Sequence, residues 1–169
     1  MTFVEHYLSE LDREAQRTRR VLEAVPQGPD MARAARQGMI GACKRMAGNP
    51  VPILGVKGIA FLADRLEKWP QKLGDEQAML YLGQLIRMQE EIGTGGAGFR
   101  FLYAAFLQEA ALLTQREQLA TLADELMVIG DGWRAFALAT ARMLRDRDPM
   151  NPARLADMLS AQADAEAAF

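Results

Sequence analysis

The sequence has very few of the side chains that most often carry nucleophilic and metal chemistry, with one cysteine, Cys43, and one histidine, His6. A single cysteine excludes a disulfide within the chain and a zinc site built from several cysteines. His6 falls on the solvent side of its predicted helix, so neither a Cys–His pair nor a Ser–His triad can be assembled with it. We therefore expect no metal and no cofactor. Cys43 shares an apolar helix side with Met39 and Met46 and is predicted to be buried.

An excess of positive charge and a long apolar run are also missing. Twenty lysines and arginines stand against 22 aspartates and glutamates, which is not the basic surface that a nucleic-acid-binding protein carries. The longest apolar run, Phe101–Leu107, is much shorter than the roughly 20 residues of a transmembrane helix. The N-terminus has no basic segment followed by an apolar one. These absences predict a cytoplasmic protein without nucleic acid or membrane as a partner.

Helical periodicity, in contrast, runs through most of the chain. Half of the 169 residues are apolar, which is enough for the core of one domain, and no segment alternates as a strand does. We predict an all-α, single-domain bundle of about six or seven helices over residues 1–169. Capping residues and stop signals place helices at about 2–25, 31–46, 54–69, 75–92, 97–113, 116–145 and 152–163. The predicted caps include Asp30, Asp75 and Asn151.

Three expectations concern how these helices pack. Pro70 should end the third helix, and the fourth should face the core with Ala78, Tyr81, Leu85, Met88 and Ile92. The helix at 97–113 is apolar nearly all round, as a central helix is. Near residues 116–145 the apolar spacing continues unchanged through Gly130 and Gly132, which predicts one long helix of roughly 28 residues.

The stretch EEIGTGGAGFR, residues 90–100, is the strongest candidate for a site. A glycine-rich turn before a helix presents free backbone N–H groups and the positive end of the helix dipole, with Arg100 one turn further on. It matches neither the phosphate-binding loop nor the dinucleotide fingerprint. The glycines could equally serve the turn alone. The predicted ligand-binding residues are Gly93, Thr94, Gly95, Gly96, Arg100, Tyr103, Glu90, Glu109 and Trp133.

The charges around this turn allow a second interpretation. Antiparallel helices joined by a short loop would place Arg100 beside Glu90, and such an ion pair would fix the turn without any chemistry. Glu109 lies about half a helical turn out of phase with Arg100, which separates the two. Trp133, which follows Gly130 and Gly132 in the sequence, could form the wall of a pocket against the helix at 97–113.

The segments ILGVKGIAFLADRLEKWPQ and EEIGTGGAGFRFLYAAFLQEAALLT, together with the Trp133 helix, resemble the helical C-terminal region of the butirosin-biosynthesis H-type family, a domain of unknown function. The resemblance covers about residues 34–144. It implies acyl transfer from the phosphopantetheine thiol of a carrier protein to an amine, performed by a cysteine-peptidase-like N-terminal domain. One helix precedes the resembling region here, so the resemblance implies an accessory module without catalytic residues.

We therefore expect a non-catalytic helical module of a biosynthetic pathway. Its partner would be a small acyl or anionic ligand, a carrier protein or a catalytic protein. One alternative is an acyltransferase-like enzyme that uses Cys43 or Glu109, and another is a structural homodimer.

Overall fold

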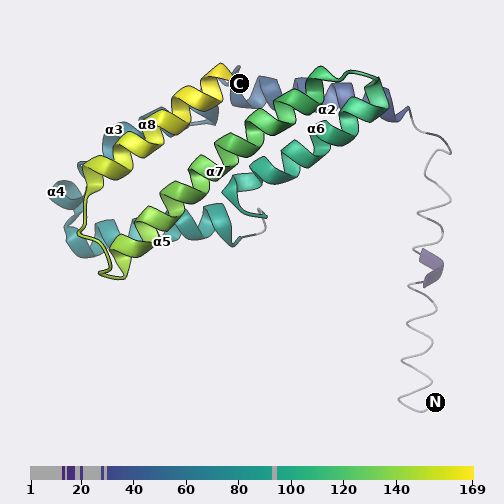
Figure 1. The fold of residues 1–169 in the computed structure, drawn as a ribbon. Coiled ribbons are helices and arrows are strands. Elements are labelled where there is room, and N and C mark those ends of the chain that lie inside the picture. The colour runs from purple at the N-terminus through teal and green to yellow at the C-terminus, as the bar shows by residue number, and fades with distance from the viewer. Residues whose placement is uncertain (1–12, 14, 18–19, 21–27, 29, 93–94) are drawn as a thin grey trace, which may run out of the picture.

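The computed structural model describes residues 13, 15–17, 20, 28, 30–92 and 95–169, and within them every regular element is helical. The all-α prediction is therefore confirmed. The predicted first helix with His6 lies almost entirely outside the described residues. The elements in Figure 1 are α2 (Met31–Met46), α3 (Gly55–Leu66), α4 (Trp69–Leu73), α5 (Asp75–Glu90), the short 3₁₀ element η1 (Ala97–Phe99), α6 (Arg100–Thr114), α7 (Gln118–Leu144) and α8 (Pro152–Ala168).

The long helix predicted near residues 116–145 is confirmed as α7, whose 27 residues span about 40 Å. It continues through Gly130 and Gly132 without a break. In Figure 1, α7 runs between α6 and α8, and it packs against both and against α5. Helix α7 is therefore the element on which the other parts of the candidate site are assembled.

The core forms where α3, α7 and α8 meet. Phe136 and Thr140 of α7, Leu66 of α3, and Leu155 and Leu159 of α8 are almost completely buried. As predicted, Asp30 and Asn151 cap helices: their side chains accept hydrogen bonds from the backbone N–H groups of Arg33 and Arg154. Asp75, also predicted as a cap, is instead the first residue of α5, which Gly74 precedes at the cap position. Helix α8 has 17 residues and is longer than expected, because its buried leucine stripe fixes it on α3 and α7.

Several packing predictions are wrong. Pro70 does not end a helix but lies in the first turn of α4, where its missing N–H costs nothing. Helix α5 buries Ala78, Leu82 and Gln89, whereas Tyr81 is exposed and packs edge-on against Trp69. Met88 and Ile92 of the predicted stripe are exposed as well.

The predictions for α6 and Cys43 also need correction. Helix α6 packs on α2 and α7, but Leu102 and Leu112 are 56% and 77% exposed, so one of its faces is open. Cys43 is exposed because α2 contacts the rest of the described structure mainly along one narrow side, where Ala35 is its only buried residue.

Candidate functional site

The turn between α5 and α6 has an uncommon backbone. Every residue of Gly95–Phe99 has a positive φ, from 49° at Ala97 to 85° at Gly96. Glycine adopts such angles freely, but an L-residue with a side chain pays about 1–2 kcal/mol. Ala97 and Phe99 therefore carry backbone strain. Strain of this kind persists only where surrounding contacts impose the conformation, and it is concentrated at functional sites.

The end of α5 holds the first half of the turn. Glu90 Oε1 accepts a hydrogen bond of 3.0 Å from the backbone N–H of Ala97 and one of 3.1 Å from Gln89 Nε2. Gln89 Nε2 also donates to the backbone carbonyl of Trp133 in α7, at 3.0 Å. These bonds connect α5, the turn and the middle of α7.

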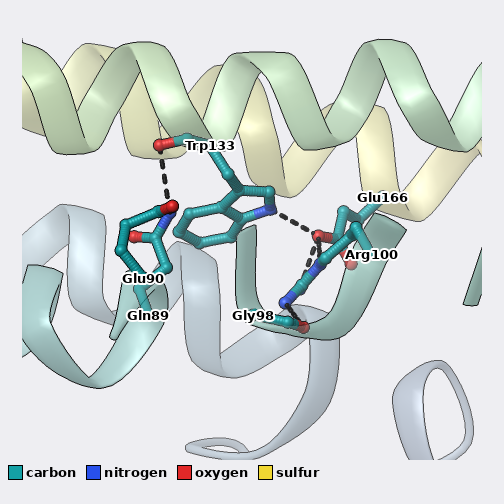
Figure 2. A network of polar contacts seen from close by, with 6 residues as sticks. All are labelled: Gln89, Glu90, Gly98, Arg100, Trp133 and Glu166. Atoms are coloured by element: carbon teal, nitrogen blue, oxygen red, sulfur yellow. Dashed lines mark hydrogen bonds and ion pairs between the residues drawn. The ribbon is translucent and has the colours of Figure 1, made fainter. Parts of the chain in front are cut away.

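Arg100 holds the second half of the turn. One of its guanidinium nitrogens donates to the carbonyl of Gly98 at 2.8 Å, and its Nε donates to Glu166 Oε1 at 2.7 Å. Trp133 Nε1 donates to the same Glu166 oxygen at 2.7 Å, and the Arg100 guanidinium lies 4.9 Å from the centre of the Trp133 ring. Figure 2 shows Glu166 between the arginine and the indole. The last turn of α8 thus takes part in fixing the turn before α6.

The predicted ion pair between Arg100 and Glu90 is wrong. The left-handed turn directs Arg100 toward α8, where the Arg100 and Glu166 side chains are 18% and 7% exposed, while Glu90 is bonded to the backbone of the turn. Trp133 is buried and its indole N–H is satisfied by Glu166. Its side chain is therefore part of the network, and it lines neither of the cavities at Glu90 and at Asp75 described below.

Gly96 lies between two side chains of opposite charge. A Cβ placed on Gly96 would come within 3.1 Å of both a guanidinium nitrogen of Arg134 and Glu90 Oε2. The Arg134 guanidinium lies 4.3 Å from the centre of the Phe101 ring. A shallow cavity of about 280 Å³ beside this point is lined by Glu90, Glu91 and Arg134 over an apolar floor that includes Ile86. Carboxylates at its rim oppose the binding of a free anion.

The outer side of the turn is apolar and accessible. Phe99 is 54% exposed, and Leu102, whose side chain lies close to Gly95, is exposed to a similar degree. Of the other predicted site residues, Tyr103 is half-buried and Glu109 is exposed further along α6, outside the network. Gly93 and Thr94 lie outside the described residues.

Tyr103 has a raised pKa. Burial, and to a smaller extent the charge of the Cys43 thiolate, raises the pKa of the Tyr103 phenol above its usual 10. A phenol with a raised pKa is neutral at physiological pH and is a weak base for activating a thiol. Its proximity to Cys43 therefore does not make a nucleophilic pair.

Sequence reasoning missed Glu166, Gln89 and Arg134. A signal was present for two of them. Glu166 continues the Leu155–Leu159–Ala163 stripe of α8, and Gln89 continues the Ala78–Leu82 stripe of α5. A polar residue at an apolar position of a helical stripe must find a buried partner, and both residues do so at Trp133.

The fold and the site define an all-α domain in which five segments meet at one polar network beside a strained turn. The chain belongs to the family described as "Domain of unknown function (DUF4872)", whose model matches residues 13–169. No curated protein matches the chain, and no solved structure does.

Within the described residues, no three histidine, cysteine, aspartate or glutamate side chains are grouped so as to hold a metal ion. In the same part of the chain, no helix combines the length and apolarity needed to cross a membrane.

Proposed function

We propose that this protein is a non-catalytic helical module that binds a partner protein through the Gly93–Gly96 turn and the start of α6. The observation that carries the proposal is the strained turn. Ala97 and Phe99 are held at positive φ by two hydrogen bonds on the inner side: the Ala97 N–H donates to Glu90, and Arg100 donates to the Gly98 carbonyl. The outer side presents Phe99 and Leu102 to solvent. Rigid, exposed apolar side chains are typical centres of protein interfaces.

A protein partner fits this geometry better than a small acyl or anionic ligand. The charge of Arg100 is already compensated by Glu166, and the N–H of Ala97 is already bonded to Glu90. Arg100 and one of the backbone N–H groups that sequence reasoning assigned to an anion are therefore engaged within the chain. The remaining surface is apolar, and it suits the apolar centre of an interface.

The resemblance to the butirosin-biosynthesis H-type family supports a finer proposal. The resembling segment, residues 34–144, lies within the matched domain and includes the whole turn. The resemblance implies acyl transfer that involves two proteins: a cysteine-peptidase-like catalytic domain and an acyl-loaded carrier protein. We propose that one of these two proteins is the partner and that its acyl transfer is a step of a biosynthetic pathway.

Two substitutions on α6 test the proposal. Leu102 and Leu112 are both exposed leucines of this helix, and only Leu102 adjoins the turn. We expect Leu102→Ser to weaken binding to an isolated butirosin-H-type catalytic domain or to an acyl-loaded carrier protein by about tenfold or more, measured by isothermal titration calorimetry. Leu112→Ser should leave the dissociation constant within about twofold of wild type.

Equal losses in the two variants, or no binding of either protein to wild type, would contradict the proposal. Native mass spectrometry of the same samples also reports the subunit number. A stable homodimer that Leu102→Ser dissociates would support the structural alternative instead.

A further inference from the structure

A second cavity, of about 450 Å³, lies at the other end of α5. Its lining includes Leu66, Ala78 and Leu82, all of which are almost fully buried core residues. Asp75 at this end and Glu90 at the turn are the first and last residues of α5, roughly 22 Å apart along the helix axis. The cavity is therefore separate from the proposed partner site, and its size is that of small-molecule sites in proteins.

The lining of this cavity combines adaptable side chains with one that is held in place. Met79 and Met150 are partly exposed and line the cavity, and methionine side chains adjust readily to apolar ligands. Trp69 also lines the cavity, and its ring is held in an edge-on contact with Tyr81, with ring centres 5.9 Å apart. An indole face attracts a positively charged group as well as hydrocarbon.

Among the described residues, Asp75 is the only charged one that lines the cavity. It is exposed at the first position of α5, and no lysine or arginine of the described residues forms an ion pair with it. A single carboxylate without an ion-pair partner at the edge of an apolar cavity favours a ligand with one positive charge on a hydrocarbon body.

We infer that this cavity binds a primary ammonium group carried by a short aliphatic chain. The chain lies between Trp69 and the two methionines, and the ammonium pairs with the carboxylate of Asp75. The same chemistry could come from a free aliphatic amine or from a lysine side chain of another protein. The inference does not depend on the function proposed for the turn.

The test uses the full-length protein with methionine methyl groups labelled with carbon-13. The methyl signals of Met79 and Met150 are followed by NMR during titration with n-hexylamine, n-hexanol or hexanoate, which differ in charge and share their chain length. We expect saturable shifts and a dissociation constant for hexylamine about fivefold below that for hexanol, with hexanoate weakest. The methyl signal of Met127 on α7, which does not line the cavity, should not move.

Two variants of the first turn of α5 provide the matched comparison. Asp75→Asn should abolish the preference for hexylamine over hexanol. Glu76→Gln removes the same charge from the neighbouring residue, which does not line the cavity, and should retain the preference. Nα-acetyl-lysine methylamide distinguishes a lysine side chain from a free amine, and binding of either that depends on Asp75 supports the inference.

Equal affinity of wild type for the three probes would overturn the inference, because the cavity would then be merely apolar. Shifts that do not saturate, or a preference for hexylamine that survives in Asp75→Asn, would overturn it as well.

Discussion

At the scale of single residues, backbone angles and neighbouring atoms restrict which side chains a position can carry. Gly96 has φ +85° and ψ 158°, a region that residues with a side chain adopt only at a cost of about 1–3 kcal/mol. Gly74, at the start of α5, has nearly the same angles, φ +83° and ψ 158°. The two positions differ in their surroundings: a Cβ at Gly74 would meet nothing within 4 Å, whereas one at Gly96 would meet Arg134 and Glu90.

Alanine substitutions at these glycines separate backbone strain from crowding. We expect Gly74→Ala to lower the free energy of unfolding by about 1–3 kcal/mol, the cost of the backbone angles alone. Gly96→Ala should cost more, because Arg134 and Glu90 must also move away from the new methyl group. Urea unfolding of both variants measures the difference. A Gly96→Ala protein as stable as Gly74→Ala would show that the two charged side chains leave room for the methyl group.

Tyr103 provides a prediction about pH. Its pKa is raised mainly by burial and in smaller part by Cys43, so Cys43→Ser should lower the pKa of Tyr103 without returning it to 10. A raised tyrosine pKa means that the folded state retains this proton more strongly than the unfolded state. Its contribution to stability is therefore complete below pH 10 and is lost as pH rises through the folded pKa. NMR titration of carbon-13-labelled tyrosine measures the shift, and an unchanged pKa in Cys43→Ser would contradict the coupling.

At the scale of helix pairs, glycine allows close packing, most clearly between α6 and α7. A Cβ on Gly130 of α7 would lie 2.7 Å from the ring of Phe101 in α6, which is closer than real contacts allow, whereas one on Gly83 of α5 would lie 3.7 Å from Leu144. Gly130 therefore lets the aromatic ring rest directly on the α7 backbone.

The same substitution at the two helical glycines should have opposite effects. Alanine favours a helix over glycine by about 1 kcal/mol, so Gly83→Ala should raise the free energy of unfolding by up to that amount. Gly130→Ala should lower it by about 1–3 kcal/mol, because the ring of Phe101 is displaced. Thermal and urea unfolding measure both changes. A Gly130→Ala protein more stable than wild type would show that α6 can shift without cost.

The elements also show what the sequence could predict. The existence of α7 followed from a long, uninterrupted apolar period, and the starts of α2 and α8 followed from Asp30 and Asn151. The inner face of α5 was assigned wrongly because two stripes were available. The stripe with Tyr81 and Met88 is as apolar as the stripe with Leu82, and only packing against α7 decides between them.

The position of the candidate site could be predicted from the sequence, but its side-chain contacts could not. Four glycines and Arg100 located the turn, because glycine marks positions of positive φ. Its partner could not be found from local spacing, because Glu166 is 66 residues from Arg100. Positive φ at Ala97 and Phe99 contradicts residue preference and becomes apparent only when tertiary contacts are known.

On the scale of the whole molecule, the polar network connects distant parts of the chain. The side chains of Gln89, Glu90, Arg100, Trp133 and Glu166 come from α5, α6, α7 and α8 (Figure 2). A largely buried pair such as Arg100–Glu166 is weak evidence for stability in itself, but removing one partner leaves the other charge uncompensated. We infer that the C-terminal end of α8 fixes the shape of a turn far away in the sequence.

This claim is tested most directly by replacing Glu166 with alanine and measuring hydrogen exchange of individual amides by NMR. We expect the amides of Ala97 and of the first turn of α6 to exchange at least about tenfold faster than in wild type, and the protein to lose about 3 kcal/mol of stability. Asp148→Ala, which breaks the exposed pair with Arg142, is the control and should leave those amides unchanged. Unaltered exchange at Ala97 and α6 in a folded Glu166→Ala protein would contradict the account, because the turn would then keep its shape without α8.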